Sequence, residues 1–362
     1  MLISWNWLRD LATVAVSPEE AAAVLTSTGL EVESVELAEP VKGMLAGVVV
    51  GQVLRCAKHP GADRLTLCDV DLGDGDPSRI NCGAPNVAEG QKVLVATVGT
   101  TLHMRDGGSI TIKKAKIRGE DSNGMICAED EVGFGESHAG IMVLDGGATI
   151  GQAASSHLGL KSDHVFSIGL TPNRADAMSH LGVARDLVAA LNHRNNAGAA
   201  LKRPDVSAFT VDDHAHSIAV EVEATAACAR YAGLSLTGVK AAPSPAWLQD
   251  RLKSIGLKPI NNVVDVTNYV QHELGQPLHA FDADKVRGGK IIVGHLPAGT
   301  KFTTLDGKER ELAADDLMIR DAEGGLCIAG VFGGSESGVN ETTTKVFLES
   351  ACFDPASVRR TA

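Results

Sequence analysis

The sequence predicts an α+β protein of several domains: a small α/β N-terminal domain interrupted by an inserted β-barrel, followed by a mixed α/β domain. Three observations predict this organisation. Helical segments with clear end signals lie near the start and again after residue 151, short β-rich runs fill about 40 to 151, and helices alternate with strands after about 205. The 362 residues suffice for two or three domains.

Composition is that of an ordinary soluble protein, with 44% apolar and 22% charged residues. No run approaches the roughly 18 to 20 apolar residues of a membrane span, and the start lacks a signal-peptide pattern. The seven cysteines include no CxxC pair, which favours reduced thiols and a cytoplasmic protein with no membrane segment. The net charge of −12 argues against non-specific nucleic-acid binding over the whole surface, but it leaves a local basic patch open.

The first helix is predicted by its start and stop signals in "SPEEAAAVLTSTG". Ser17 is placed to cap the helix, Pro18 occupies its first turn, Glu20 completes a capping box, and Gly29 ends it. The stripe expected to be buried consists of Ala22, Val24 and Leu25.

The β-rich runs that follow are "GMLAGVVVGQVLRC", "LTLCDVDLG", "KVLVATVG" and "SITIKKAKI", separated by clusters of Gly, Asp and Pro. Their length and spacing predict a small barrel. A helix is then predicted from about Ala177, with one face made of Leu181, Ala184, Leu187, Val188 and Leu191. The barrel is therefore predicted to be inserted into a helical unit, and residues 195–204 read as a linker.

After the linker, "SPAWLQDRLKSIG" repeats the Ser, Pro, amphipathic helix, Gly formula. The predicted strands are "KIIVGHL", a hairpin "KFTTLDGKEREL" that turns at Asp306-Gly307, "DLMIRD", "GLCIAGVFGG" and "KVFLESACF". These patterns predict the mixed α/β domain.

The stretch "VTNYVQHELGQPLHAFD", residues 266–282, gathers many neutral hydrogen-bonding side chains. We expect a helix capped by Asn262 and ended by Gly275, with His279 in the loop that follows. Thr267 lies near the helix face of Val263, Val266, Val270 and Leu274, and Asn268 lies about a hundred degrees round the axis. Two interpretations stay open: these groups satisfy local backbone, or they line a pocket for a polar ligand.

A second unusual stretch, "AGVFGGSESG" at residues 329–338, holds four glycines, which allow close approach to the backbone. Glu336 lies among them, where a carboxylate is more often a solvated charge than a ligand group. The stretch is not a serine-hydrolase elbow, and "HELGQ" lacks the second histidine of a zinc helix, so we expect no metal site.

The densest basic cluster comprises Lys113, Lys114, Lys116 and Arg118 in "ITIKKAKIRGEDSNGMI". On a continuous strand, the last three would share one face. A charge run is usually a solvated surface, but on a small barrel it is also a plausible track for RNA.

Longer motifs resemble a known family. "HPGADRLTLCDVDLG", "INCGAPNVAEGQKVLVATVG" and "KIRGEDSNGMICAEDEVG" resemble the EMAP-type tRNA-binding domain, an OB-fold. "MLISWNWLRDL" with "GLEVESVE", and later "TPNRADAMSHLGVARDL", resemble the split N-terminal domain of the bacterial phenylalanyl-tRNA synthetase beta subunit. "GLKPINNVVDVTNYVQHELGQPLHAFD", "AGVFGGSESGV" and "LESACFDPASVRRTA" resemble its editing domain.

The resemblance implies three domains. They are a split N-terminal domain at 1–39 plus 152–194, an EMAP-like OB-fold at 40–151, and an editing domain at 205–362 that we expect to be cut short at its C-terminal end.

It also implies a function: tRNA binding and hydrolytic editing of mischarged Tyr-tRNA(Phe), in support of a phenylalanine–tRNA ligase. The implied partners are tRNA(Phe) and the alpha subunit, in a heterotetramer of two alpha and two beta subunits. The ATP and Mg²⁺ of aminoacylation belong mainly to the alpha subunit. We therefore expect no cofactor in this chain and no aminoacylation by it alone.

Site residues follow from the same resemblance. Glu336 matches the residue that accepts the tyrosine hydroxyl, and His279 matches a histidine beside the ester. Thr267 and Asn268 match groups near the amino acid and the tRNA end. The backbone that would let the substrate approach is that of Gly330, Gly333 and Gly334. A water would attack the ester, with no covalent intermediate.

Two rival interpretations stay open. In one, the chain is a non-catalytic tRNA-binding or assembly module. In the other, it is a free-standing trans-editing protein that ends at residue 362.

Overall fold

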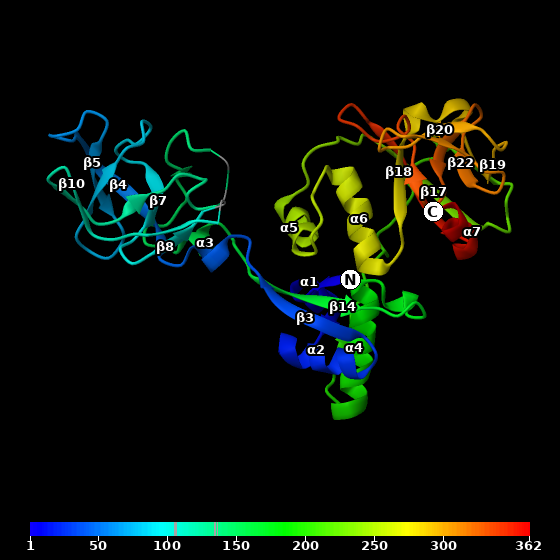
Figure 1. Ribbon diagram of the computed structural model, residues 1–362, viewed down its shortest axis with the longest axis horizontal. Helices are drawn as coiled ribbons and strands as arrows, with labels where there is room; N and C mark the ends of the chain where they lie inside the picture. Colours follow the sequence, from blue (N-terminus) through cyan, green and yellow to red (C-terminus); the bar gives the residue numbers. More distant parts are fainter. Residues whose placement is uncertain (105–106, 134, 136) are drawn as a thin grey trace. The chain divides into compact units, whose positions relative to one another are not determined.

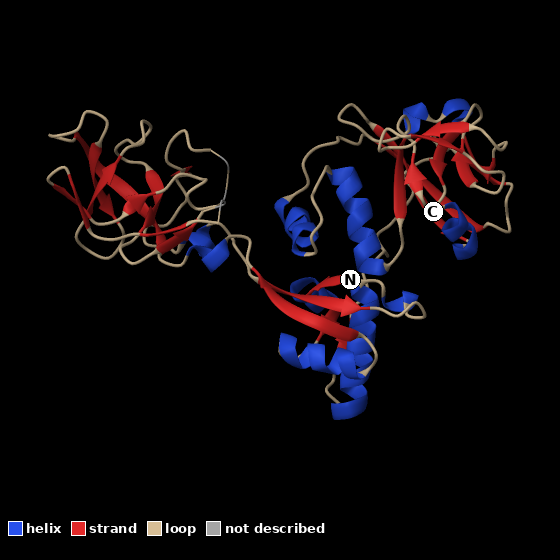
Figure 2. Cartoon of the chain, in the orientation of Figure 1, coloured by secondary structure: helices blue, strands red, loops and turns tan. Residues whose placement is uncertain are grey.

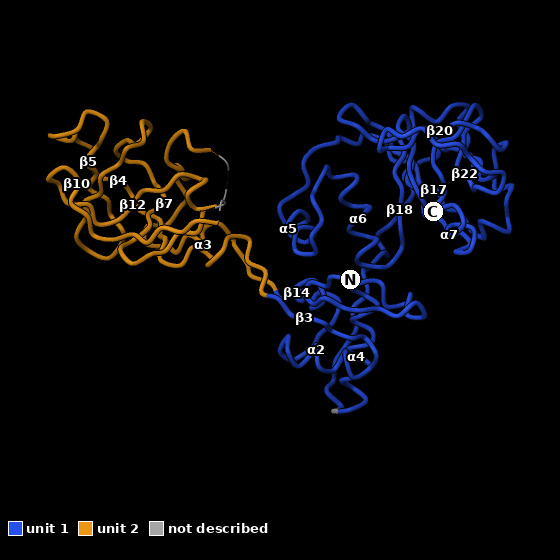
Figure 3. Tube along the Cα trace, viewed as in Figure 1, with its two compact units in different colours: residues 1–36, 164–362 blue, residues 37–163 orange. Residues whose placement is uncertain are grey.

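The computed structural model describes residues 1–104, 107–133, 135 and 137–362. They form two compact units, one joining Met1–Glu36 to His164–Ala362 and the other spanning Leu37–Asp163 (Figure 3). The second unit is inserted into the first and extends beyond the predicted barrel limits of 40 and 151 at both ends. No helix in the described ranges is long and apolar enough to cross a membrane.

The first unit begins with a three-stranded sheet in the order β1-β14-β3, on which helices pack (Figure 1). The elements of this part are β1 (Leu2–Ser4), α1 (Trp5–Leu11), β2 (Ala12–Thr13), α2 (Pro18–Ser27), β3 (Glu31–Ala38), β14 (Asp163–Gly169), η2 (Ala175–Ala177), α4 (His180–Asn195) and β15 (Ala200–Leu201). Its core contains Trp7, Leu8, Leu25, Phe166 and Leu187, each completely buried.

Helix α2 has the predicted start. The Ser17 hydroxyl accepts from the Glu20 N–H, and the Glu20 carboxylate accepts from the Ser17 N–H, so the capping box is confirmed. Helix α4 begins at His180 rather than near Ala177, because the Ser179 hydroxyl caps the N–H of Gly182. After residue 151 the sequence predicted helices, but the structure also has strand β14 there, whose residues alternate between buried and partly buried along most of its length.

The inserted unit is a nearly closed barrel, as predicted. Its sheet has the order β12-β7-β4-β5-β6, with the end strands β12 and β6 in contact. Its elements are η1 (Lys42–Leu45), β4 (Val48–Lys58), β5 (Thr66–Asp71), β6 (Ser78–Cys82), β7 (Lys92–Ala96), β8 (Thr101–His103), β9 (Ser109–Thr111), β10 (Ala115–Ile117), β11 (Glu120–Ser122), β12 (Met125–Ile126), β13 (Val143–Leu144) and α3 (Ala154–His157). Figure 2 shows how strongly strands dominate this unit.

The last part of the first unit contains two facing sheets, β17-β25-β18 and β16-β19-β22-β23-β24, with helices α5 and α6 between β17 and β18 in the chain. Its elements are β16 (Ala219–Val222), β17 (Cys228–Thr237), α5 (Ala246–Ser254), α6 (Asn262–Leu274), β18 (Leu278–Asp282), η3 (Ala283–Lys285), η4 (Arg287–Gly289), β19 (Lys290–His295), β20 (Lys301–Thr303), β21 (Glu309–Glu311), β22 (Leu317–Arg320), β23 (Gly325–Ile328), β24 (Phe332–Gly333), β25 (Lys345–Phe353) and α7 (Pro355–Thr361). The predicted hairpin at 301–311 is confirmed as β20 paired with β21.

Side chains from both sheets form one core, which includes Phe281 and Phe347 from one sheet and Ile291, Ile319 and Cys327 from the other. The sheets therefore pack face to face, and a side chain that points inward from either sheet is shielded from water.

Helix α6 differs from its prediction at its start and on its buried face. The cap is Asn261, whose side chain accepts from two helix N–H groups, whereas Asn262 bonds to the backbone of Lys240 and Ala242. The expected apolar face is not a core face, since Val266 is 44% exposed and Leu274 is 41% exposed.

The face of α6 that is buried is acidic and hydrogen-bonded. The Asp265 carboxylate accepts from the Ser244 hydroxyl at 2.5 Å and from the Ile260 N–H at 2.8 Å. The Glu273 carboxylate accepts from the Trp7 indole N–H at 2.8 Å. Hydrogen-bonded polar side chains therefore hold this helix against its neighbours. The apolar contacts that the spacing of its valines and leucine predicted do not have this role.

A buried histidine ties α6 to the N-terminal helices. His180 stacks on Trp7 with 4.0 Å between ring centroids, and Tyr269 of α6 stacks on Trp7 at 4.6 Å. The His180 Nδ1–H donates to the carbonyl oxygen of His272 at 2.8 Å, and its Nε2 accepts from the Ser4 N–H at 3.0 Å. Both nitrogens are thus used by the neutral ring, and burial lowers the pKa of His180 to about 3.

This depressed pKa predicts a loss of stability in acid. Between the folded pKa near 3 and the ordinary histidine value, the unfolded chain binds more protons, so stability falls as pH drops. We expect His180 to contribute about 2 kcal/mol less to the free energy of unfolding at pH 5 than at pH 7.5. Urea unfolding of the native chain and of His180→Gln, which cannot titrate, measures this difference. An equal pH dependence in the two proteins would contradict it.

Candidate active site

His279 lies on strand β18, not in the loop that we predicted after α6. In the sheet register it stands opposite Glu349 of β25, and opposed residues of neighbouring strands point to the same face. Its ring meets the edge of Phe281 with 4.5 Å between centroids. Among the described residues, its Nε2 is one of three buried side-chain nitrogen or oxygen atoms without a hydrogen-bond partner. Burial lowers the pKa of His279, which favours the neutral imidazole.

The glycine stretch comes close to this imidazole. A Cβ atom on Gly333 would lie 3.0 Å from Cε1 of His279 and 2.7 Å from Cδ1 of Leu305, so a side chain at this position would press against the imidazole. Gly334 is equally constrained, since its Cβ would lie 2.6 Å from the carbonyl oxygen of Leu326. Gly330 has a φ of +69° and forms a turn before these residues. The structure therefore brings Gly333 and His279 together.

Glu349 is a further candidate that our sequence analysis missed. Its side chain is 6% exposed, and it accepts a hydrogen bond of 2.8 Å from the Tyr231 hydroxyl. Burial raises the pKa of Glu349 to about 7. The signal was present in "KVFLESACF", because alternation along this strand puts Glu349 on the same face as the buried Phe347.

The other predicted catalytic residues lie in different surroundings. Glu336 is exposed, in the turn after β24. Thr267 is buried, and its hydroxyl donates to the Val264 carbonyl at 2.7 Å. This bond agrees with the interpretation that the polar groups of this stretch satisfy local backbone. Asn268 is partly buried. Roles for these three residues in a substrate site stay predictions.

The four basic residues of the barrel are all exposed, but they do not lie on one strand. Strand β9 ends at Thr111 and β10 begins at Ala115, so Lys113 and Lys114 lie between strands. Lys116 stands opposite Asp121 in β10–β11, and Arg118 lies in a turn with a φ of 48°. We expected Lys114, Lys116 and Arg118 to share one face of a continuous strand, and this expectation is wrong. Their role in RNA binding stays a prediction.

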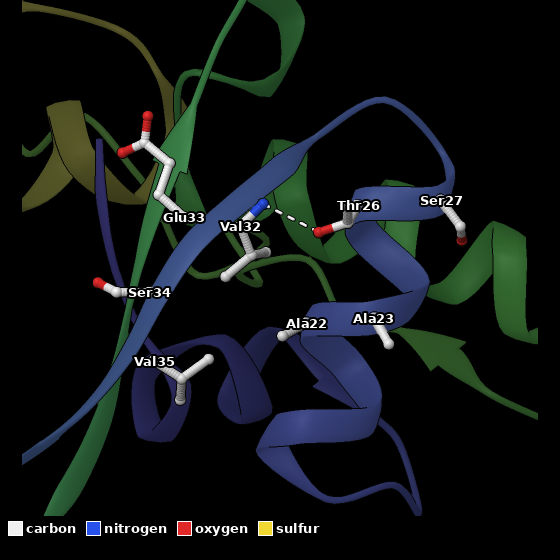
Figure 4. A pocket seen from close by; sticks show the side chains of 8 residues that line it. All are labelled: Ala22, Ala23, Thr26, Ser27, Val32, Glu33, Ser34 and Val35. Carbon is white, nitrogen blue, oxygen red and sulfur yellow. Dashed lines mark hydrogen bonds between the residues drawn. The ribbon is translucent and has the colours of Figure 1, made fainter.

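Two surface pockets lie away from these residues. One lies between α2 and β3, where the Thr26 hydroxyl accepts from the Val32 N–H at 3.0 Å (Figure 4). Its ionisable residue, Glu33, accepts from the Ser167 hydroxyl, and the rest of its wall is small or apolar. The other is lined by 223–227 with Gly294 and His295. Across the described ranges, no group of three or more His, Cys, Asp or Glu side chains is placed to hold a metal ion.

The raised pKa of Glu349 predicts that this residue lowers the free energy of unfolding as pH rises. The folded state binds more protons than the unfolded state between the ordinary glutamate value and about 7, so stability is greater below this window and is lost through it. We expect Glu349→Gln to lose less stability than the native chain between pH 5 and pH 8, by about 2 to 3 kcal/mol. Chemical unfolding at several pH values measures this. Parallel curves would contradict the burial of an ionisable carboxyl.

Comparison with known proteins places these features in a family. Residues 227–362 match the model of the B3/4 domain, and residues 48–153 match that of a putative tRNA binding domain. A phenylalanine–tRNA ligase beta subunit from Bacteroides fragilis is 56% identical over 100% of this chain and 44% of its own length. One from Salinibacter ruber is 52% identical, again over 100% of this chain and 44% of its own length.

An N-terminal fragment of the phenylalanyl-tRNA synthetase beta-subunit from Pyrococcus horikoshii aligns with 54% of this chain and 58% of its own, at 16% identity and a TM-score of 0.30. The chain spans less than half the length of the curated relatives that it matches. Over its whole length, the chain belongs to the family of phenylalanine–tRNA ligase beta subunits.

Proposed function

We propose that the domain formed by the two facing sheets hydrolyses the ester of tyrosine mischarged to tRNA(Phe), within a phenylalanine–tRNA ligase of two alpha and two beta subunits. The observation that carries this proposal is the arrangement around His279. Its unpartnered Nε2 lies beside the bare backbone of Gly333, and His279 stands opposite Glu349 in the strand register. The membership of the family and the match to the B3/4 domain support the same function.

Physical chemistry explains why such a site is needed. A pocket built for phenylalanine rejects tyrosine poorly, because discrimination against an added hydroxyl is on the order of a hundredfold. A second site that binds the hydroxyl can select far more strongly, since a buried polar group stays unpaired when the hydroxyl is missing. That selection needs an acceptor shielded from water.

We propose that Glu336 accepts the hydroxyl of the substrate tyrosine, which is the role that the resemblance implies. Glu336 is exposed in the turn after β24, so the bound substrate would have to shield its carboxylate from water. Glu349 is buried and faces the same side of the sheet as His279. Thr267 and Asn268 remain proposed contacts for the amino acid and the tRNA end, with the backbone of Gly330, Gly333 and Gly334 admitting the substrate.

The reaction requires only a positioned water. The neutral imidazole of His279 orients the water through Nε2 and accepts its proton as the water attacks the ester carbonyl. The bond between the carbonyl carbon and the ribose oxygen then breaks, and the ribose leaves with a proton. Tyrosine and tRNA are released without a covalent intermediate.

We propose that the barrel is an OB-fold that contacts tRNA through Lys113, Lys114, Lys116 and Arg118, all of them exposed. ATP and Mg²⁺ serve aminoacylation in the complete cytoplasmic synthetase, and this chain supplies neither site. The rival function, a non-catalytic tRNA-binding module, would rest on the barrel alone and would leave the buried His279 and Glu349 without a role.

Substitution at the site tests the hydrolytic function in the complete alpha/beta enzyme. We expect His279→Ala and Glu336→Ala each to lower the rate of Tyr-tRNA(Phe) hydrolysis at least tenfold, because one loses the water-orienting nitrogen and the other the proposed hydroxyl acceptor. Aminoacylation with phenylalanine serves as the folding control, and Glu341→Ala removes an exposed carboxylate as a matched variant. Wild-type hydrolysis by both site variants would refute the assignment.

Salt dependence tests the barrel. We expect the triple variant Lys114→Ala, Lys116→Ala, Arg118→Ala to bind tRNA(Phe) more weakly at low salt, because three phosphate contacts are removed. The slope of log affinity against log salt concentration should fall by about 2 to 3. Replacing Lys114 and Lys116 by Arg conserves the charge and should preserve the slope. An unchanged slope in the triple variant would show that tRNA binds elsewhere.

A further inference from the structure

Two cysteine thiols face each other inside the barrel. Cys56 of β4 stands directly opposite Cys68 of β5 in the antiparallel register. Their sulfur atoms are 3.8 Å apart, so either thiol can donate to the other. Both belong to one core cluster of the barrel, in which Cys68 is completely buried and Cys56 is partly buried. Neither the proposed hydrolysis nor the proposed tRNA contact involves this pair.

A β-bulge in strand β4 creates the pairing. The register between β4 and β5 shifts by one residue between Val53 and Arg55, so Leu54 is an extra residue in β4. Without it, the residue opposite Cys56 would be a neighbour of Cys68, and the two thiols would point to opposite faces of the sheet. The bulge therefore places both thiols on the same face.

The hydrogen-bond pattern makes this the closer kind of cross-strand pair. Just beyond the ends of the two strands, the His59 N–H donates to the Leu65 carbonyl at 3.1 Å, so these two residues form a hydrogen-bonded pair. Pairs of the two kinds alternate, and Cys56–Cys68 lies three positions along, so it is a non-hydrogen-bonded pair. The Cα atoms of such pairs are about 4.5 Å apart. That separation lies within the range of about 4.4 to 6.8 Å that a disulfide spans.

A third thiol of the same core cluster has no cysteine opposite it. Cys82 of β6 stands opposite Thr66, whereas Cys68 stands opposite Ile80. Cys82 is therefore diagonal to Cys68 rather than facing it. Within the described part of the chain, no three such side chains are placed to hold a metal ion, so these thiols are not a metal site.

We propose that Cys56 and Cys68 form an oxidative modification site, at which a peroxide converts the two thiols into a disulfide that locks β4 to β5. The inference is independent of the proposed function. In a reducing compartment the pair stays as two thiols, and a disulfide there is transient.

The reaction has two steps. The Cys56 thiolate attacks an oxygen of hydrogen peroxide, so that an S–O bond forms, the O–O bond breaks, and the departing hydroxide takes up a proton to become water. The Cys68 thiolate then attacks the sulfur of Cys56, so that the S–S bond forms, the S–O bond breaks, and hydroxide leaves as a second water. The two thiols together give up two protons and two electrons, and the peroxide is reduced to two waters.

Exposure determines the order of the two steps. Cys56 is the less buried of the two thiols, so the oxidant reaches it first. Burial raises the pKa of Cys68, and the neighbouring Cys56 adds to that rise. Oxidation of Cys56 to the sulfenic acid removes the negative charge at its sulfur. Cys68 then forms its thiolate more readily, as the second step requires.

The disulfide would stabilise the hairpin that joins β4 to β5. It closes a short segment of chain between the two cysteines, which restricts the unfolded state. The hairpin loop begins at His59, whose Nδ1 accepts from the Gly61 N–H and whose Nε2–H donates to the Ile117 carbonyl at 3.0 Å. The locked strands therefore also support strand β10, which ends at Ile117.

The experiment treats the complete alpha/beta enzyme with hydrogen peroxide and maps the beta-chain cysteines by mass spectrometry. A Cys352→Ser background is used as well as the native chain, because Cys352 is exposed and can react by itself. We expect the peptides that contain Cys56 and Cys68 to become joined, with the loss of two hydrogen atoms, and dithiothreitol to separate them. Proteolytic cleavage within β4 and β5 should become at least tenfold slower in the oxidised protein.

Single variants test the order of the steps. Cys68→Ser should stop at the sulfenic acid of Cys56, which dimedone labels, whereas Cys56→Ser should give neither label nor disulfide at Cys68. Cys82→Ser is the matched control, because it removes a buried thiol of the same cluster and should still form the disulfide.

Three outcomes would overturn the proposal. They are thiols at Cys56 and Cys68 that stay unlinked after peroxide treatment, a link between Cys68 and Cys82, and a disulfide that leaves proteolysis of β4 and β5 unchanged. Mapping of the native chain needs no substitution in the barrel, so it decides the first two even where a variant does not fold. Hydrolysis of Tyr-tRNA(Phe) is not a readout here, so failure of this proposal and failure of the proposed function are separate results.

Discussion

The candidate site depends on one constraint, which is that β25 pairs on both sides. Its register with β18 sets Glu349 beside His279, and its register with β17 sets Tyr231 within hydrogen-bond distance of the same carboxyl. Because side chains alternate across a strand, a slip of one residue in either pairing would move one member to the opposite face. The two strand pairings thus act as a rigid frame for groups that come from distant parts of the chain.

Burial decides the chemistry of these groups. In water, the imidazole and the carboxyl would each take up and release protons near their ordinary pKa values. Between the sheets, burial lowers the pKa of His279 and raises that of Glu349, so the histidine stays neutral while the glutamate approaches its midpoint near pH 7. Burying these two ionisable groups therefore costs the domain stability.

Local signals in the sequence predicted local structure well. The capping box of α2, the hairpin of β20 and β21, and the barrel all follow from residues close together in the chain, and the structure confirms them. The errors arose where tertiary contacts override periodicity. The apolar stripe of α6 is half exposed because Asp265 and Glu273 find partners in Ser244 and Trp7, which no local pattern indicates. The basic run of the barrel is not one strand either: Lys113 and Lys114 lie between β9 and β10, Lys116 lies on β10, and Arg118 lies in a turn.

Candidate site residues were harder to predict than elements, because a role depends on burial as well as identity. Glu336 and Glu349 are both glutamates near the glycine stretch in sequence, and the resemblance favoured the one within it. Only the register shows that Glu349 is inward-facing, and only the close approach of Gly333 to His279 shows which side of the sheet the glycine stretch covers. A carboxylate discriminates between a phenol and a phenyl ring when water cannot replace the phenol. Of these two glutamates, the strand pairing keeps Glu349 inside the sheet pair, whereas Glu336, in its exposed turn, is the one that a substrate can reach without displacing core side chains.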